Sequence, residues 1–271
     1  MSYRGVILFL TLILPSLSPA EPSPPLGKSS VSDEVNLEGR VLFLGDSITH
    51  AGYYVSMIDM ALRERGVRPF PEMINLGLPS ETVTGLSEPE HPWPRPDVHE
   101  RLDRALATIR PDLVFACYGM NDSIYHPFSE ERFRQYQDGI GLLIEKVRKS
   151  GAKLVLMTPP PFDPLRLRNQ GKLKPAGVEA YSWKEIYEHY DSEVIARYGA
   201  WILRQRKRVD GVIDFRPAIV ERLKKERMGD PDFTYSNDGV HANADGHRVM
   251  ARTIMAALGL DPQTKVPGIN S

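Results

Sequence analysis

The chain has 271 residues, of which 41% are hydrophobic and 25% are charged, the proportions of an ordinary globular protein with a sizeable core. Its formal net charge of −1 provides no basic field to hold a polyphosphate backbone, so we expect no nucleic acid partner. The single cysteine, Cys117, excludes an intrachain disulfide and a cysteine-based zinc site.

The first twenty residues have the pattern of a secretory signal peptide. Arg4 gives a basic start, residues 6–14 form an apolar run, and small residues precede Glu21, so we expect cleavage after Ala20. The run is too short to span a bilayer well, although retention as an uncleaved anchor is the alternative. A flexible leader is expected over residues 21–36, which are rich in proline, serine and acidic side chains. The sequence thus predicts a secreted or periplasmic protein with no stable membrane anchor after cleavage.

A strand, a tight turn and a helix are predicted next. The apolar run 41–44 ends at Gly45-Asp46-Ser47, and helical spacing follows over residues 51–65. Ser47 would then lie at the amino end of a helix, where unpaired N–H groups and the helix dipole favour negative charge. That position suits a nucleophile. A helix cap is the alternative, because Gly, Asp and Ser are turn residues in any case.

Strands and helices alternate along the rest of the chain. Short apolar runs predict strands at 72–77, 112–118, 153–158 and 211–215. Helical spacing predicts helices at 98–109, 129–151, 181–208, 217–227 and 244–258. Residues 85–97, which are rich in proline, and residues 159–177, which show neither period, are predicted as loops. The alternation predicts a single α/β domain over residues 37–260, with a parallel sheet covered by helices on both faces, and a tail over 261–271.

Polar turn residues follow each of the first three strands. These turns are Gly45-Asp46-Ser47, Asn75-Leu76-Gly77 and Gly119-Met120-Asn121-Asp122. Because the carboxyl ends of parallel strands meet at one edge of a sheet, we expect the turns to lie close together. Just before the last helix, Asp238 precedes His241 by three residues, so its carboxylate can contact imidazole Nδ1. A histidine oriented in this way can serve as a base.

In their order and intervals, these segments resemble the blocks of the SGNH subgroup of GDSL-type esterases and lipases, over residues 41–251. The resemblance implies a flavodoxin-like three-layer sandwich with a parallel sheet of about five strands. It implies that Ser47 is the nucleophile, that His241 is the general base and acid, and that Asp238 holds the imidazole tautomer. The chemistry agrees, because a free serine hydroxyl is barely nucleophilic and needs a neighbouring base.

The same resemblance implies an oxyanion hole made by the backbone N–H groups of Ser47 and Gly77 and by the side-chain amide of Asn121. Charge on a tetrahedral intermediate needs such preorganised donors. A glycine suits position 77, because a side chain there could crowd the substrate. Ser80 departs from the family pattern, which often has a second glycine at this position, and this leaves the loop shape and the direction of the Gly77 N–H open.

Other polar residues are expected to have structural roles. Asp46 and Asp122 are predicted to brace their turns, and Cys117, in an apolar run, to be a packed core thiol. The remaining histidines have no metal-ligand spacing, so neither a metal nor a cofactor is implied. The loop 159–177 leaves the fourth strand at the catalytic edge, so we predict that it borders the cleft and influences substrate choice. A solvated surface loop is the alternative.

Together, these observations favour a secreted serine esterase that acts through an acyl-enzyme. The expected partner is a small-molecule or polysaccharide ester, with short O-acyl groups such as acetyl on carbohydrate as the preferred substrate. Export makes polymers outside the cytoplasm available, and no long apolar segment suggests a lid for a fatty chain. One alternative is an acylhydrolase of the lysophospholipase or thioesterase type. The other is a catalytically silent module of the same fold that binds glycan or lipid.

Overall fold

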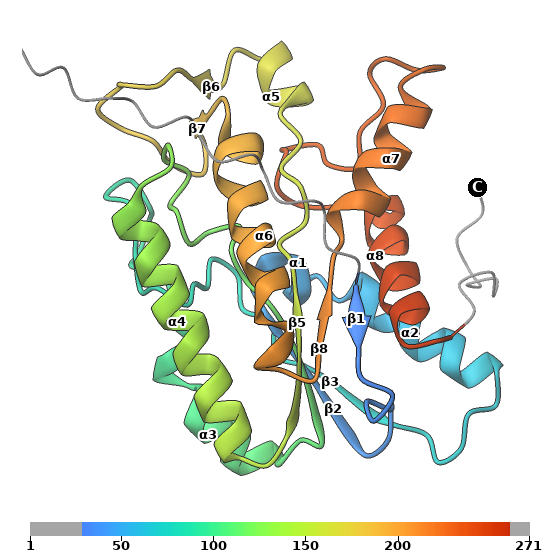
Figure 1. Ribbon diagram of the computed structural model, residues 1–271. Helices are drawn as coiled ribbons and strands as arrows, with labels where there is room; N and C mark the ends of the chain where they lie inside the picture. Colours follow the sequence, from blue (N-terminus) through green and yellow to red (C-terminus); the bar gives the residue numbers. More distant parts are fainter. Residues whose placement is uncertain (1–28, 261–271) are drawn as a thin grey trace, which may run out of the picture.

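The computed structural model describes residues 29–260. The signal peptide expected at 1–20, the first part of the leader expected at 21–36 and the tail expected at 261–271 therefore lie outside the described residues. Helices α3 (Leu102–Ile109), α4 (Glu130–Lys149) and α6 (Ala196–Leu203) cover one face of a sheet, and α2 (Tyr53–Glu64), α7 (Arg216–Glu226) and α8 (Ala244–Ala257) cover the other (Figure 1). The predicted three-layer sandwich is confirmed.

The sheet is parallel except at one edge. Its strands follow the order β1 (Ser30–Val31), β8 (Gly211–Ile213), β5 (Lys153–Met157), β4 (Leu113–Cys117), β2 (Arg40–Gly45) and β3 (Glu72–Asn75). All but β1 form the predicted parallel sheet, in the flavodoxin-like order that places β2 between β3 and β4. β1 pairs antiparallel with β8. Part of the segment expected as a leader is therefore an edge strand, and the sheet begins at Ser30, before the expected start at residue 37.

The central strands form the core and set the position of the turns that follow them. Residues 41–44 of β2 are fully buried, because helices cover both faces of the sheet. Cys117, at the end of β4, is 2% exposed, which confirms the predicted core thiol. The register places Gly45 opposite Cys117. The turns after β2 and β4 therefore leave the sheet side by side.

The helix predicted over residues 51–65 begins earlier and is broken. α1 (Ser47–His50) starts directly at the turn, and α2 follows after Gly52. Gly52 has a φ of +78°, in the left-handed region that disfavours side chains, so it marks the break. The sequence did not indicate this, because a single glycine inside a helical pattern is also compatible with a continuous helix.

The helix predicted over residues 181–208 is wrong in its first part. Ile186–Tyr187 is β7, a strand that pairs in parallel with β6 (Leu173–Lys174). The helical region starts with a π-helical turn over Tyr190–Ile195, continues as α6 and ends with a 3-10 turn over Arg204–Lys207. A two-residue strand is too short to show its own period.

The segment 159–177, predicted as a loop, contains two short elements, α5 (Leu165–Asn169) and β6. Together with β7 they lie beyond the carboxyl edge of the sheet, at the top of Figure 1. We call residues 159–189 the insertion. The insertion therefore lies at the edge of the sheet where the loop 159–177 was predicted.

The remaining helices agree with the prediction. α4 begins after Ser129, whose side chain accepts a hydrogen bond from the Arg132 N–H, as expected of a helix cap. The helix predicted from residue 98 is a 3-10 turn (Val98–Glu100) followed by α3. No helix among residues 29–260 is long and apolar enough to cross a membrane.

Gly139, within α4, packs directly against a neighbouring loop. A Cβ at this position would lie 2.0 Å from the backbone oxygen of Val83, a contact that requires one of the two backbones to move. We predict that Gly139→Ala lowers the free energy of unfolding by about 1–3 kcal/mol, the usual cost of overpacking. Urea denaturation measures this change.

Gly141 offers a matched control in the same helix. A Cβ there would have only the guanidinium of Arg208 within 4 Å, at 3.9 Å. Gly141→Ala should therefore raise the free energy of unfolding by about 0.5–1 kcal/mol, because alanine favours the helix. Equal effects of the two substitutions would contradict the packing argument.

Candidate active site

Ser47, His241 and Asp238 form a chain of hydrogen bonds at the carboxyl edge of the sheet. His241 Nε2 lies 2.8 Å from Ser47 Oγ, and His241 Nδ1 lies 2.6 Å from Asp238 Oδ2. Ser47 and His241 are 194 residues apart in the sequence. The fold brings them together because α1 and the turn before α8 lie at the same end of the sheet. The residues predicted as nucleophile, base and orienting acid are thus in contact.

Asp46 and Asp122 brace the turns that surround the serine, as predicted. Asp46 caps α1, and its Oδ1 accepts a hydrogen bond from the Ile48 N–H at 2.9 Å. Asp122 Oδ1 accepts from the Val83 N–H at 2.7 Å. Burial raises the pKa of Asp46 to about 6 and that of Asp122 to about 7, against the opposing effect of these hydrogen bonds.

Asp238 holds its own turn together as well as the histidine. Its Oδ1 accepts hydrogen bonds from the N–H groups of Val240 and His241 at 3.0 and 2.8 Å, and from the Ser236 hydroxyl at 3.0 Å. Burial acts to raise the pKa of the Asp238 carboxyl, but the hydrogen bonds from His241 and Val240 outweigh it, so this pKa lies well below its usual range. The hydrogen bond with Asp238 in turn raises the pKa of His241, although burial opposes the shift.

A second histidine attaches the helix that follows the catalytic turn. His247, on α8, is 1% exposed and stacks on Tyr54 of α2, with the ring centroids 5.8 Å apart. Burial, and to a lesser degree the charge of His241, lowers the pKa of His247 to about 4, so it is neutral at neutral pH. It packs as an aromatic side chain between the two helices and fixes the start of α8 relative to α2.

One of the three predicted oxyanion donors is bound by another group. The Gly77 N–H donates to Asn75 Oδ1 at 2.9 Å, and Asn75 Nδ2 donates to the Thr49 carbonyl at 2.8 Å. Position 77 requires a glycine, but for a different reason from the predicted crowding of the substrate. A Cβ there would lie 2.2 Å from the backbone nitrogen of His50. Ser80 has a φ of +66°, the left-handed conformation that a glycine would take readily, so the loop keeps that shape without one.

The other two predicted donors suit the role. The Ser47 N–H is in the first turn of α1, where backbone N–H groups have no partner within the helix. Asn121 is 3% exposed; its Nδ2 donates to the Glu81 carbonyl at 3.2 Å, and its Oδ1 accepts from the Tyr125 hydroxyl at 2.7 Å. Because Nδ2 carries two hydrogens, one remains for a ligand.

A cleft of about 350 Å³ opens beside the triad. Its lining consists of Asp238, Val240 and His241 from the catalytic turn, together with Tyr125, Leu167, Lys172, Trp183 and Lys184. Leu167 and Lys172 belong to the segment 159–177, which confirms that this segment borders the cleft. The sequence did not indicate Tyr125, Trp183 or Lys184, because no motif includes them and residues 183–184 fell within the predicted helix.

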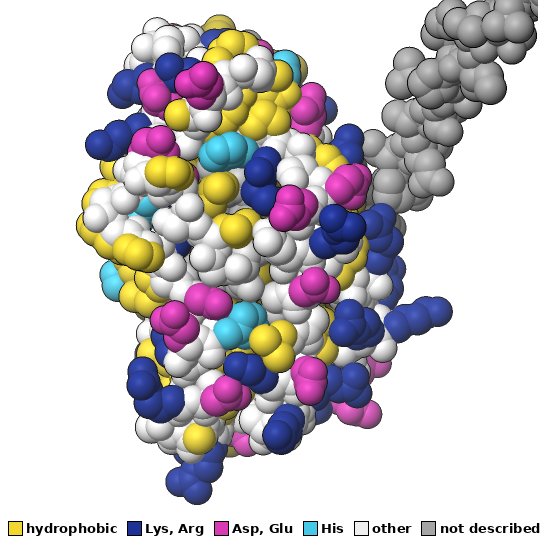
Figure 2. Space-filling view, turned by 90° about the vertical axis from the view of Figure 1, so that its left-hand side faces the viewer, with side chains coloured by type: hydrophobic (Ala, Val, Ile, Leu, Met, Phe, Trp, Pro, Cys, Tyr) yellow, Lys and Arg dark blue, Asp and Glu magenta, His cyan; other side chains and the backbone are white. Residues whose placement is uncertain are grey.

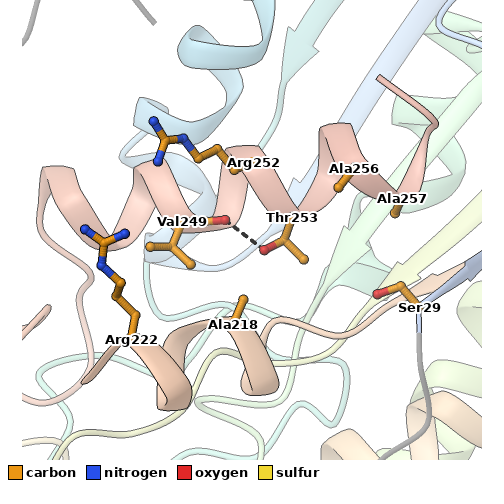
Figure 3. Close-up of a pocket in the computed structure, with 8 residues that line it drawn as sticks. All are labelled: Ser29, Ala218, Arg222, Val249, Arg252, Thr253, Ala256 and Ala257. Atoms are coloured by element: carbon orange, nitrogen blue, oxygen red, sulfur yellow. Dashed lines mark hydrogen bonds between the residues drawn. The ribbon is translucent and has the colours of Figure 1, made fainter. Parts of the chain in front are cut away.

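A larger cavity, of about 570 Å³, lies between α7 and α8 (Figure 3). Its walls are formed mainly by Ala218, Val249 and the stems of Arg222 and Arg252, with none of the triad residues among the lining side chains. The hydroxyl of Thr253 is satisfied within its own helix, because it donates to the Val249 carbonyl at 2.8 Å. This cavity is thus separate from the cleft at His241.

The face of the molecule shown in Figure 2 has no single dominant sign of charge. On this face, basic and acidic side chains are intermixed, as the net charge of −1 suggests.

Across residues 29–260, no group of three or more His, Cys, Asp or Glu side chains is arranged to hold a metal ion.

Several solved structures share this fold. BT4096, a gut microbial diltiazem-metabolizing enzyme, is 23% identical, with a TM-score of 0.59 over 87% of this chain and 48% of its own, so the chain spans about half the length of that protein. A variant of Axe2, an acetyl xylan esterase from Geobacillus stearothermophilus, is 19% identical, with a TM-score of 0.56 over 86% of this chain and 97% of its own. A GDSL-like lipase from Bacteroides thetaiotaomicron is 17% identical, with a TM-score of 0.51 over 81% of this chain and 87% of its own.

The sequence itself identifies the family. No curated protein sequence matches the chain. The sequence model of the GDSL-like lipase/acylhydrolase family, however, matches residues 43–249, a span that includes Ser47, Asp238 and His241. The chain therefore belongs to the GDSL-like lipase/acylhydrolase family and is a carboxylic ester hydrolase.

Proposed function

We propose that the chain is a serine esterase that works through an acyl-enzyme. Ser47 is the nucleophile, His241 the general base and acid, and Asp238 the residue that orients the imidazole. The observation that carries the proposal is the unbroken hydrogen-bond chain from Asp238 Oδ2 through both nitrogens of His241 to Ser47 Oγ, with distances of 2.6 and 2.8 Å. Such a chain supplies the neighbouring base that a serine hydroxyl needs.

The reaction has two halves. As Ser47 Oγ attacks the ester carbonyl carbon, its proton passes to His241 Nε2, and ionised Asp238 stabilises the imidazolium. The oxyanion accepts hydrogen bonds from the Ser47 N–H and from Asn121 Nδ2. The tetrahedral intermediate then expels the alcohol, which takes the proton from His241. In the second half, water gives a proton to His241 and attacks the acyl group. The second tetrahedral intermediate then collapses, His241 returns the proton to Ser47 Oγ, and the carboxylic acid is released.

We infer that the preferred substrate is a short O-acyl ester of a carbohydrate, such as an acetyl ester. The cleft is small, and its wall combines the ring of Trp183, which is 43% exposed, with the amines of Lys172 and Lys184. Aromatic rings offer flat apolar contact surfaces, and the amines offer hydrogen-bond donors. This mixture suits a sugar, which has apolar faces and a polar rim, better than a fatty chain. The similar structure of an acetyl xylan esterase also supports this inference.

We further propose that the protein is secreted or periplasmic. The basic start, short apolar run and small residues of positions 1–20 support export. An exported esterase would meet polysaccharide esters outside the cytoplasm, which agrees with the proposed substrate.

Loss of the serine or the histidine tests the mechanism. Ser47→Ala and His241→Ala should each lower kcat for 4-nitrophenyl acetate by roughly 10⁴- to 10⁶-fold, because the two residues act as one unit. The double variant should be little slower than either single variant. Steady-state kinetics, with circular dichroism to verify folding, measures these effects.

Ser56→Ala is the matched control, because Ser56 is an exposed serine on α2. It should keep wild-type kcat. Losses that multiply in the double variant would show that Ser47 and His241 do not work together. Equal turnover by wild type and Ser47→Ala would favour a silent binding module.

The pH profile should report the protonation of His241. kcat/KM should rise with pH, because only the neutral ring accepts the proton of Ser47. Asp238 raises the pKa of His241, so the midpoint of this rise should lie above about 6.5, the ordinary value for histidine. In Asp238→Asn the carboxylate charge is lost, so the midpoint should move to lower pH while kcat falls. An unmoved midpoint would show that Asp238 does not set the pKa.

Substrate preference can be measured with a series of 4-nitrophenyl esters from acetyl to palmitoyl. We expect kcat/KM to be highest for acetyl and to fall with chain length, because the cleft is small and partly polar. A preference for long chains would count against the carbohydrate substrate and favour an acylhydrolase of the lysophospholipase or thioesterase type.

Trp183→Ala adds a test of the alcohol part. It should raise KM for an acetylated xylo-oligosaccharide and leave KM for 4-nitrophenyl acetate nearly unchanged, because Trp183 would contact the sugar beyond the ester. Equal changes for the two esters would contradict a sugar-binding role.

A further inference from the structure

The side-chain amide of Asn121 is held at both ends. The Tyr125 hydroxyl donates to Oδ1 at 2.7 Å, and Nδ2 donates to the backbone oxygen of Glu81 at 3.2 Å. A backbone carbonyl can only accept, so the contact with Glu81 fixes which end of the amide is the nitrogen, and the contact with Tyr125 agrees with it. The amide therefore has one orientation, with one Nδ2 hydrogen left for a ligand.

The turn that carries Tyr125 has an unusual backbone. Ile124 and Tyr125 have φ values of +45° and +63°, in the left-handed region that a β-branched residue rarely adopts. The Ile124 N–H donates to the Asn121 carbonyl at 2.8 Å, so the chain folds back on itself. This returns the Tyr125 hydroxyl to a residue four positions earlier. Strained backbone of this kind persists only where the surrounding structure holds it, and it clusters at functional sites.

The ring of Tyr125 is fixed by its surroundings. It is 3% exposed, with the guanidinium of Arg95 and the ring of Tyr190 each 5.4 Å from its centroid. Arg95 is in turn bound to Glu88 by two hydrogen bonds of 2.6 and 2.7 Å, and these two side chains are 1% and 0% exposed. The hydroxyl of Tyr125 therefore has little freedom to leave Asn121.

We propose that Tyr125 is a positioning residue for the oxyanion site, where its hydroxyl holds the Asn121 amide so that the second Nδ2 hydrogen meets the oxyanion. The inference rests on the proposed function, in which Asn121 is an oxyanion donor. Donation to Oδ1 also polarises the amide and strengthens Nδ2–H as a donor. Because the oxyanion exists only along the reaction, the contribution belongs to the transition state and not to substrate binding.

Tyr125→Phe removes the hydroxyl and keeps the ring. We expect kcat for 4-nitrophenyl acetate to fall about tenfold, the effect of one hydrogen bond. KM and the acid limb of the pH profile should stay unchanged, because neither the cleft shape nor His241 is altered. Asn121→Ala should lower kcat by roughly 10²- to 10³-fold. The double variant should be no slower than Asn121→Ala alone, because the hydroxyl acts only through the amide.

Tyr187→Phe is the matched control. The Tyr187 side chain is 4% exposed, and its hydroxyl donates to Glu193 Oε2 at 2.8 Å, outside the lining of the cleft. This variant should keep wild-type kcat. Kinetics are measured below the thermal unfolding transition of every variant, so that a loss of stability is not taken for a loss of catalysis.

Three results would each overturn the positioning role of Tyr125. These are a wild-type kcat in Tyr125→Phe, a raised KM at constant kcat, and losses that multiply when Asn121→Ala is added. Each differs from failure of the proposed function, which would appear as equal turnover by wild type and Ser47→Ala.

Discussion

The site depends on how closely α1 approaches the ends of two strands. A Cβ on Gly45, at the end of β2, would lie 2.2 Å from Thr49 Oγ1. A Cβ on Gly77, just beyond β3, would lie 2.2 Å from the backbone nitrogen of His50. Only hydrogen atoms fit in these two places, so the two glycines let a single helical turn pack against the neighbouring backbone. Ser47, the first residue of that turn, is thereby fixed at a helix N-terminus on the sheet edge.

The walls around this fixed serine come from separate parts of the chain that are joined by buried polar contacts. The ion pair between Glu88 and Arg95 is almost completely buried, and such a pair is weak evidence for stability because desolvation opposes it. Its partners show what it does here. Arg95 lies over the ring of Tyr125, and Glu88 Oε1 accepts from the Trp183 N–H at 3.3 Å. One ion pair thus connects the loop 85–97, the turn after β4 and the insertion into a single cleft wall.

Residues whose role follows from a local pattern could be predicted from the sequence. The alternation of apolar runs predicted the parallel sheet, and the turn after the first strand predicted the place of Ser47. The spacing of Asp238 and His241 before the last helix predicted their contact, and the family resemblance supplied the expected roles of all three residues. Gly77 shows the limit. The sequence indicated that position 77 needs a glycine, but not that the glycine packs against α1. The helix was predicted to start at residue 51, four residues after its actual start at residue 47.

The insertion shows a second limit. β6 and β7 have two residues each and exist only because they pair with one another across the chain, so neither has a period of its own. Ile186 and Tyr190 are four residues apart, which matched a helix although only Tyr190 is helical. Tyr125 likewise acts through a contact to Asn121 that depends on the backbone conformation of the turn, and residue type does not reveal that conformation.

The separation of 194 residues between Ser47 and His241 has a consequence for biosynthesis. A ribosome that adds about 5–20 residues per second needs roughly 10–40 s to pass from the serine to the histidine. During that interval the growing chain carries the serine hydroxyl without a neighbouring base, and such a hydroxyl is barely nucleophilic toward esters. In the proposed mechanism, a chain that stops before residue 241 has no general base for Ser47. In that mechanism, hydrolytic activity arises late in synthesis, when α8 can pack against α2.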